Sequence, residues 1–157
     1  MSALFPEVYK IVTGSAVATT DGGLNGAYVS LKDAKRVIVV VELLQAATHE
    51  TGLNIGIREE IGSGTEEAST ATMPVWKNAN IATNDTLVRE SSDAHTIAAS
   101  AGANNQLLVI EVLPERLKAG FKAIRAQLAN SGESGNFATI TYLIETAYPQ
   151  ATPPSAV

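Results

Sequence analysis

The stretch Ala138-Thr139-Ile140-Thr141-Tyr142-Leu143-Ile144-Glu145 decides the fold of this chain. Successive side chains of a β-strand point to opposite faces, so its alanine, isoleucines and tyrosine share one face, and its threonines and glutamate share the other. An apolar face opposite a polar one is typical of a half-buried antiparallel strand. The pattern predicts such a strand over 137–147.

Two other segments favour strands with a different pattern. The run Val37–Val41 is apolar throughout, which predicts a central strand with both faces covered. In 54–61 the alternation breaks before Ile61, and a bulge near Glu59-Glu60 would restore it.

Turn-forming residues divide the chain into short pieces. Asp21-Gly22-Gly23, Asn25-Gly26 and Gly62-Ser63-Gly64 are examples of this turn chemistry. Many short strands at such spacing are typical of a sandwich or a barrel. The expected strands are 8–18, 26–31, 36–46, 53–61, 70–77, 85–90, 94–100, 106–113, 120–129 and 137–147.

One segment supports two structures. Between Pro114 and Leu128, apolar residues recur at helical spacing, and the proline suits a first helical position. Gly120 in the middle opposes a helix. The alternative is a connection over 113–119 followed by a strand over 120–129.

Composition narrows the class of partner. The chain has 157 residues, a net charge of −5 and 45% hydrophobic residues, which fits one globular domain. A negative chain does not suit a nucleic-acid backbone, and no apolar run is long enough to span a bilayer. Cysteine is absent, so disulfides and thiolate chemistry are excluded. No basic and apolar leader opens the chain, so we expect no secretion signal.

The residues that carry chemistry form no motif. His49 and His95 lack a partner at metal-ligand spacing and are expected to be solvated loop residues. The asparagine-rich segment 78–85 lacks the acidic ligands of a calcium loop. Phosphate-binding loops, dinucleotide turns and nucleophile elbows are also missing from the sequence. We therefore expect a protein that is not an enzyme and that binds no metal or cofactor.

Two features indicate contact surfaces. Trp76 is the only tryptophan, and it is either a buried core or interface aromatic or a platform for a sugar. Residues 148–157 contain three prolines, which cannot complete a strand ladder. They form either a frayed end or an extended C-terminal arm that lies on a neighbouring copy. We expect a domain over 1–147, an arm over 148–157, and the interface residues Trp76, Tyr148, Pro149, Pro153, Pro154 and Val157.

Three groups of residues carry a resemblance to a known class of protein. They are Gly26–Lys32 with Arg36–Ala46, then Trp76-Lys77-Asn78 with Asp85-Thr86-Leu87, and finally Leu108–Val112 with Gly120–Arg125, Tyr142-Leu143 and Ala151-Thr152-Pro153-Pro154-Ser155-Ala156. On these residues the chain resembles small structural proteins from the head-gene region of tailed bacteriophages, including decoration or cement proteins. Where such proteins often have an aromatic-Arg-Tyr turn before the arm, this chain has Thr146-Ala147-Tyr148-Pro149.

The resemblance implies an all-β, antiparallel β-sandwich of jelly-roll type, with 120–128 as a strand. The expected core includes Val39, Val41, Ile57, Val109, Ile140, Tyr142 and Ile144. It further implies a virion protein, made in the cytoplasm of a bacterial host, that binds the major capsid protein and copies of itself. The alternatives are a tail or head–tail joining component and, in another class, a carbohydrate-binding or adhesion module that uses Trp76.

Overall fold

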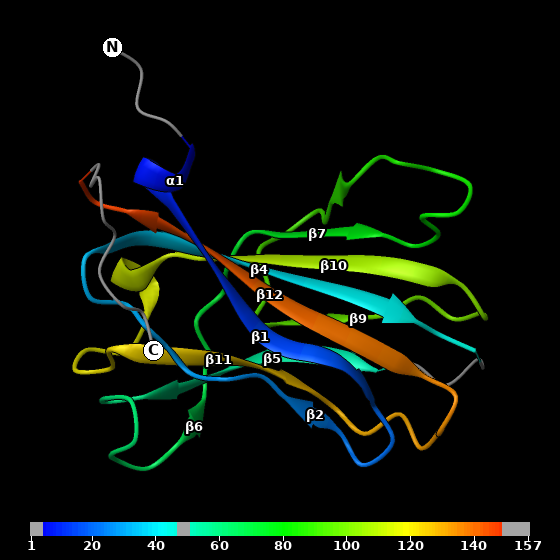
Figure 1. Cartoon of the computed structure of the whole chain (residues 1–157), viewed down its shortest axis with the longest axis horizontal. Helices are drawn as coiled ribbons and strands as arrows, with labels where there is room; N and C mark the ends of the chain where they lie inside the picture. The colour runs from blue at the N-terminus through cyan, green and yellow to red at the C-terminus, as the bar shows by residue number, and fades with distance from the viewer. Residues whose placement is uncertain (1–4, 47–50, 149–157) are drawn as a thin grey trace.

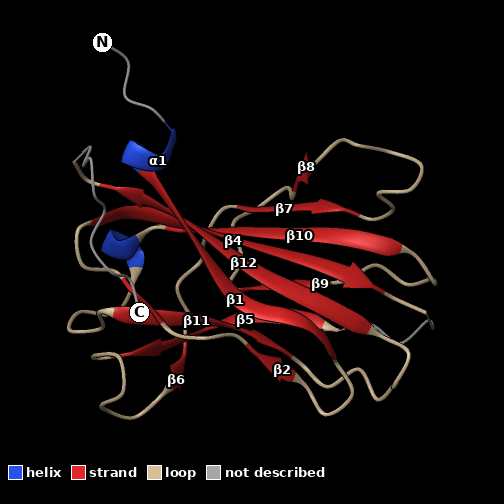
Figure 2. Cartoon of the chain, in the orientation of Figure 1, coloured by secondary structure: helices blue, strands red, loops and turns tan. Residues whose placement is uncertain are grey.

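The computed structural model describes residues 5–46 and 51–148. Strands dominate it, and the two short helices lie at one end of the molecule (Figure 2). In chain order the elements are α1 (Phe5–Val8), β1 (Tyr9–Thr19), β2 (Leu24–Asn25), β3 (Val29–Ser30), β4 (Ala34–Leu44), β5 (Gly52–Arg58), β6 (Glu67–Ala68), β7 (Val75–Asn78), β8 (Val88–Arg89), β9 (Thr96–Ala98), β10 (Asn105–Val112), the 3₁₀ helix η1 (Pro114–Arg116), β11 (Ala123–Leu128) and β12 (Phe137–Thr146).

These strands form two antiparallel sheets that pack face to face (Figure 1). The first sheet has the order β1-β12-β4-β10-β7-β8. The second sheet has the order β2-β11-β5-β6, with β3 also paired to β11 and β9 also paired to β5. The inner faces of both sheets supply one continuous hydrophobic core.

The connectivity is that of a jelly roll. The chain passes from β1 in the first sheet to β2 and β3 in the second, back to β4, and again to β5. After the excursion through β6, β7 and β8, it returns through β9, β10, β11 and β12 with the same exchange between layers. Without β3, β6, β7 and β8, the strand order is β1-β12-β4-β10 in the first sheet and β2-β11-β5-β9 in the second. This confirms the predicted all-β sandwich of jelly-roll type.

Tyr142 on β12 joins the two layers by hydrogen bonds. Its Oη accepts from the backbone N–H of Ala126 at 2.9 Å and donates to the carbonyl of Ala27 at 2.9 Å. Ala126 lies on β11 between the residues that pair with β2 and those that pair with β3. The tyrosine hydroxyl therefore occupies a break in the ladder of the second sheet. Burial of the side chain raises the pKa of Tyr142 to about 12.

Two glycines leave room for this ring. A Cβ at Gly14 would overlap the ring carbons of Tyr142, and a Cβ at Gly26 would overlap its Oη. Neither site tolerates a side chain without moving the tyrosine, so the two glycines are required by close packing.

Between the two structures expected for 114–128, a helix or a connection followed by a strand, the structure shows the second. Only Pro114–Arg116 is helical, as the single turn η1, and Ala123–Leu128 pairs with Leu53–Arg58 of β5. Gly120, with φ of 92°, turns the chain between these two pieces. The local helical spacing was a wrong indicator, because the apolar residues reach the core from a turn and a strand instead.

Three expectations need correction. No bulge continues β5 past Glu59-Glu60, because the strand ends at Arg58 and Glu60 pairs with Ser63 across a tight turn. The run Val37–Val41 of β4 is buried on its inner face only, and its outward residues, Ile38 and Val40, are half-buried. Val109 is buried, but it points away from the core, since its neighbours in the sequence, Leu108 and Ile110, point inward. The other predicted core residues, Val39, Val41, Ile57, Ile140, Tyr142 and Ile144, are confirmed.

The predicted boundary between a domain over 1–147 and an arm over 148–157 stays a prediction. The last strand ends at Thr146, and Tyr148 is the last described residue. Residues 149–157 lie outside the described part of the chain.

Candidate interaction surface

The outer face of the first sheet, which points away from the second sheet, carries two rows of mainly apolar side chains. Charged residues lie on both sides of these rows, with Arg36, Glu111 and Glu145 at one end and Glu42 toward the other. Along one row, Ile11 of β1 lies opposite Leu143 of β12, and Leu143 lies opposite Ile38 of β4. Ile11 is 59% exposed, and the other two side chains are half-buried. Three adjacent strands therefore present aliphatic side chains to solvent at the same level.

The next row continues this surface to the far side of the sheet. Thr141 lies opposite Val40, Val40 opposite Val109, and Val109 opposite Trp76 of β7. Val109 is only 7% exposed because its neighbours on both strands cover it. The guanidinium of Arg89 lies 5.8 Å from the centre of the Trp76 ring, a cation–π contact. The tryptophan is held at the edge of the apolar rows.

Further apolar residues lie at the end of the face where β12 begins. Val17 is 69% exposed and Leu44 is 50% exposed. Together with Phe137 they line a shallow hollow of about 230 Å³. These residues form a second apolar patch, which the exposed Glu42 on β4 and Thr139 on β12 separate from the two central rows.

The outer face of the second sheet has the opposite character. It carries the side chains of Asn54, Arg58, Arg125 and Gln127, and Arg125 forms an ion pair with Glu66 at 2.7 Å. A polar outer face is what an antiparallel sheet in water normally shows. The first sheet departs from this rule, and contiguous exposed apolar surface marks an interaction site.

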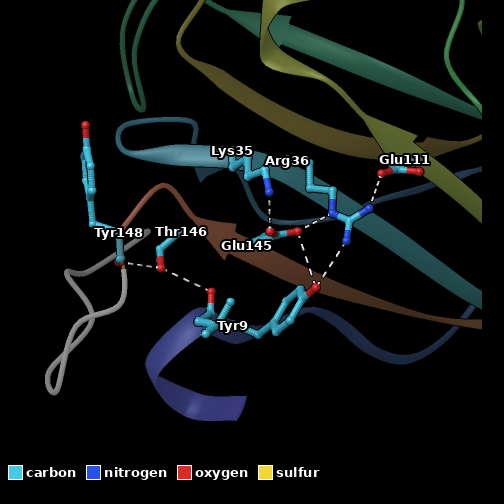
Figure 3. Close-up of polar contacts among 8 residues, drawn as sticks. Tyr9, Lys35, Arg36, Glu111, Glu145, Thr146 and Tyr148 are labelled. Carbon is cyan, nitrogen blue, oxygen red and sulfur yellow. Dashed lines mark hydrogen bonds and ion pairs between the residues drawn. The ribbon is translucent and has the colours of Figure 1, made fainter. Parts of the chain in front are cut away.

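A polar cluster borders the apolar face where β12 ends (Figure 3). Arg36 on β4 donates to Glu145 on β12 and to Glu111 on β10, the second contact being 2.5 Å. Its remaining nitrogen donates to the hydroxyl of Tyr9 on β1 at 3.2 Å. Lys35 donates to the other oxygen of Glu145 at 3.0 Å. One arginine therefore ties together four adjacent strands.

These contacts shift the ionisation of the cluster. The hydrogen bonds from Arg36 to Glu111 and Tyr9 raise the pKa of the guanidinium above its usual range. Burial works against ionisation of Glu145, but hydrogen bonds from Lys35 and Arg36 outweigh it and lower the pKa of the carboxyl. Arg36 and Glu145 therefore form an ion pair at the border of the apolar face.

The predicted interface residues fall into two groups. Trp76 lies on the outer face of the first sheet and is half-buried. Tyr148 follows β12, is 71% exposed, and points away from the polar cluster (Figure 3). Pro149, Pro153, Pro154 and Val157 lie outside the described residues. Their role as contact residues stays a prediction.

The remaining members of the face were missed by sequence reasoning. Ile11, Ile38, Val40 and Leu143 were not predicted as contact residues, although the unbroken run Val37–Val41 contained the signal. A strand with two apolar faces needs a layer on each side, and among residues 5–46 and 51–148 only the second sheet covers β4, on its inner face.

The described residues offer little for catalysis. Residues 5–46 and 51–148 contain no group of three or more histidine, aspartate or glutamate side chains placed to hold a metal ion. A hollow of about 640 Å³ is lined by Lys32, Glu60, Phe121 and Lys122 among others, and its ion pair between Lys122 and Glu60 is 3.7 Å long and exposed. The expectation that the chain is not an enzyme stays a prediction.

The histidines and the asparagine-rich loop add no site. His95 is exposed in the segment before β9, and His49 lies outside the described residues. In the loop, Asn78 donates to the carbonyl of Asn84 at 2.6 Å, and Asn80 donates to Asn104 at 3.0 Å. These amides are used to shape the loop itself.

Comparison with known proteins finds similarity among solved structures alone. No family model matches the sequence, and no curated protein matches it. Among solved structures, the fold is similar to that of the SPBc2 prophage-derived protein YomS, with a TM-score of 0.49 and 10% identity, over 87% of this chain and 93% of that chain. A match this distant says nothing about activity or partners. No helix in the described part of the chain is long and apolar enough to cross a membrane.

Proposed function

We propose that this chain is a structural protein of a bacteriophage virion that decorates the capsid, binding the major capsid protein and neighbouring copies of itself. The apolar outer face of the first sheet carries the proposal. A face of half-buried and exposed aliphatic residues, bordered by a fixed polar cluster, suits a permanent protein contact more than a free surface.

Chemistry and composition agree with this role. A protein that remains in a particle gains from few oxidisable residues, and this chain has no cysteine and two methionines. The jelly roll pairs its first long strand with its last, so the body resists opening at either end. The resemblance of three sequence stretches to phage head proteins supports the same assignment.

The test is to locate the chain in the purified particle by cryo-electron microscopy. Density on the outer surface of the capsid, with the first sheet against a neighbouring subunit, is the expected result. Density at the neck or tail would favour the tail or head–tail joining alternative instead. Absence of the chain from the particle would refute the proposal.

Matched variants connect that result to the face. Thr141→Glu places a charge in the middle of the outer face, whereas Thr96→Glu makes the same change at an exposed position on the second sheet. In particles assembled without the native chain, the first variant is expected to bind at least about tenfold more weakly. The second variant is expected to bind like the unmodified protein, and equal binding by both would show that another surface makes the contact.

A further inference from the structure

We propose that the outer face of the first sheet binds residues 149–157 of a second copy of this chain. This inference deepens the proposed function by naming one partner of that face. It rests on the proposed function only for the presence of neighbouring copies in the particle.

The described part of the chain ends at Tyr148, two residues after β12, beside the N-terminal helix α1. Thr146 Oγ1 lies 3.1 Å from the carbonyl of Val8 and 2.9 Å from the carbonyl of Tyr148, which fixes this end of β12 against α1. Tyr148 precedes Pro149, and a residue before proline favours an extended conformation.

The chemistry of the segment matches the face. Residues 149–157 read Pro-Gln-Ala-Thr-Pro-Pro-Ser-Ala-Val and contain no charged side chain. Burying them against Val40, Leu143 and Thr141 would bury no charged side chain of the segment, and burial of an unpaired charge is costly. Trp76, half-buried and in contact with the guanidinium of Arg89, supplies an aromatic ring at the edge of the face, and proline-rich segments dock on aromatic residues. The polar outer face of the second sheet offers no comparable apolar strip.

Residues 149–157 are also long enough to cross the outer face of the first sheet. In an extended or polyproline conformation, residues 149–157 reach about 28–30 Å. Strands in a sheet lie about 4.8 Å apart, so the distance from β12 across β4 and β10 to β7 is about 15 Å. The segment can cross all the apolar rows.

The first experiment measures self-association of the purified full-length protein by sedimentation velocity. We expect concentration-dependent oligomers for the full chain and for Thr96→Glu, and monomers for Thr141→Glu and for a truncation that lacks 149–157. A full chain that stays monomeric over the whole concentration range would overturn the proposal. So would a truncated chain that associates as strongly as the full one.

Mixing the two monomeric variants separates this arrangement from direct packing of one face on another. The truncated chain keeps an intact face, and Thr141→Glu keeps an intact arm. If the arm of one copy binds the face of another, the mixture forms a new, larger species. If two faces pack directly, the truncated chain associates alone and the mixture gains nothing.

A peptide provides a readout that does not depend on the folding of a face variant. Trp76 is the only tryptophan and lies on the proposed surface, so its fluorescence reports on occupation of the face. Titrating a synthetic peptide of residues 147–157 onto the truncated chain should shift the emission to shorter wavelength with saturable binding. No binding at millimolar peptide would overturn the proposal. If the peptide binds in this assay but the chain is absent from purified particles, the proposed function is wrong and the contact between arm and face is still supported.

Discussion

Replacing Tyr142 by phenylalanine tests the idea that a side chain of one sheet completes the ladder of the other. The ring is kept, so core packing is preserved, and only the hydroxyl is lost. That hydroxyl accepts from the N–H of Ala126 and donates to the carbonyl of Ala27, both at 2.9 Å. The change removes both hydrogen bonds and adds no new group.

The cost follows from the surroundings of the two partners. Ala126 is fully buried, so its N–H is left without an acceptor, which costs about 1–3 kcal/mol. Ala27 is exposed, and water can replace the lost donor at its carbonyl. We expect the free energy of unfolding to fall by about 2 kcal/mol, and the melting temperature by about 4–8 °C for a domain of this size.

Urea unfolding followed by circular dichroism measures this change, and Tyr28→Phe is the matched control. The hydroxyl of Tyr28 is buried, but it has no hydrogen-bond partner in the described structure, so its removal should cost almost nothing. A high-pH series adds a second readout. The folded pKa of about 12 lies above the ordinary value of 10.0, so stability should fall as pH rises from 10 to 12, and less so in Tyr142→Phe. The reasoning fails if both phenylalanine variants are equally stable at neutral pH.

Three further predictions concern single positions. Gly26→Ala places a Cβ against the buried hydroxyl of Tyr142 and should destabilise the fold by about 1–3 kcal/mol in the same urea assay. The control Gly52→Ala, whose Cβ would meet its nearest neighbour at 3.6 Å, should be nearly neutral. Equal losses of stability in the two variants would show that the packing around Tyr142 is not tight. Glu145 has a lowered pKa, so its stabilising contribution is present at neutral pH and is lost as pH falls below the ordinary value of 4.5. Glu145→Gln should therefore reduce stability by about 1–3 kcal/mol at pH 7 and flatten the acid side of the stability curve; parallel curves for variant and parent would contradict this. Replacing His49 and His95 by alanine should leave the melting temperature and assembly unchanged, and stoichiometric metal binding that disappears in the double variant would refute their inert role.

Much of the fold could be predicted, because strands and turns depend on residues that are close together in the sequence. The alternation in 138–145 correctly assigned Tyr142 and Ile144 to the core. Local spacing failed over 114–128, where the apolar positions suit a helix and a strand equally well. Pairing with β5 decides between them, and pairing depends on residues far away in the chain.

The interaction surface was harder to predict for a related reason. A sequence shows that Ile38 and Val40 are apolar, but it does not show whether another layer of the same chain covers them. Trp76 was recognised only because it is a single aromatic beside a loop. Its neighbours on the face come from strands that are distant in sequence, and only the three-dimensional register brings them together.

The position of β4 has a consequence for how the protein is made. This central strand pairs with β10 and β12, both of which come much later in the chain. A ribosome therefore releases an apolar strand long before its partners exist, and such unpaired segments are prone to join other chains. Because non-local pairing also slows folding, the nascent protein depends on rapid completion or on a chaperone to protect Val37–Val41 until β12 has emerged.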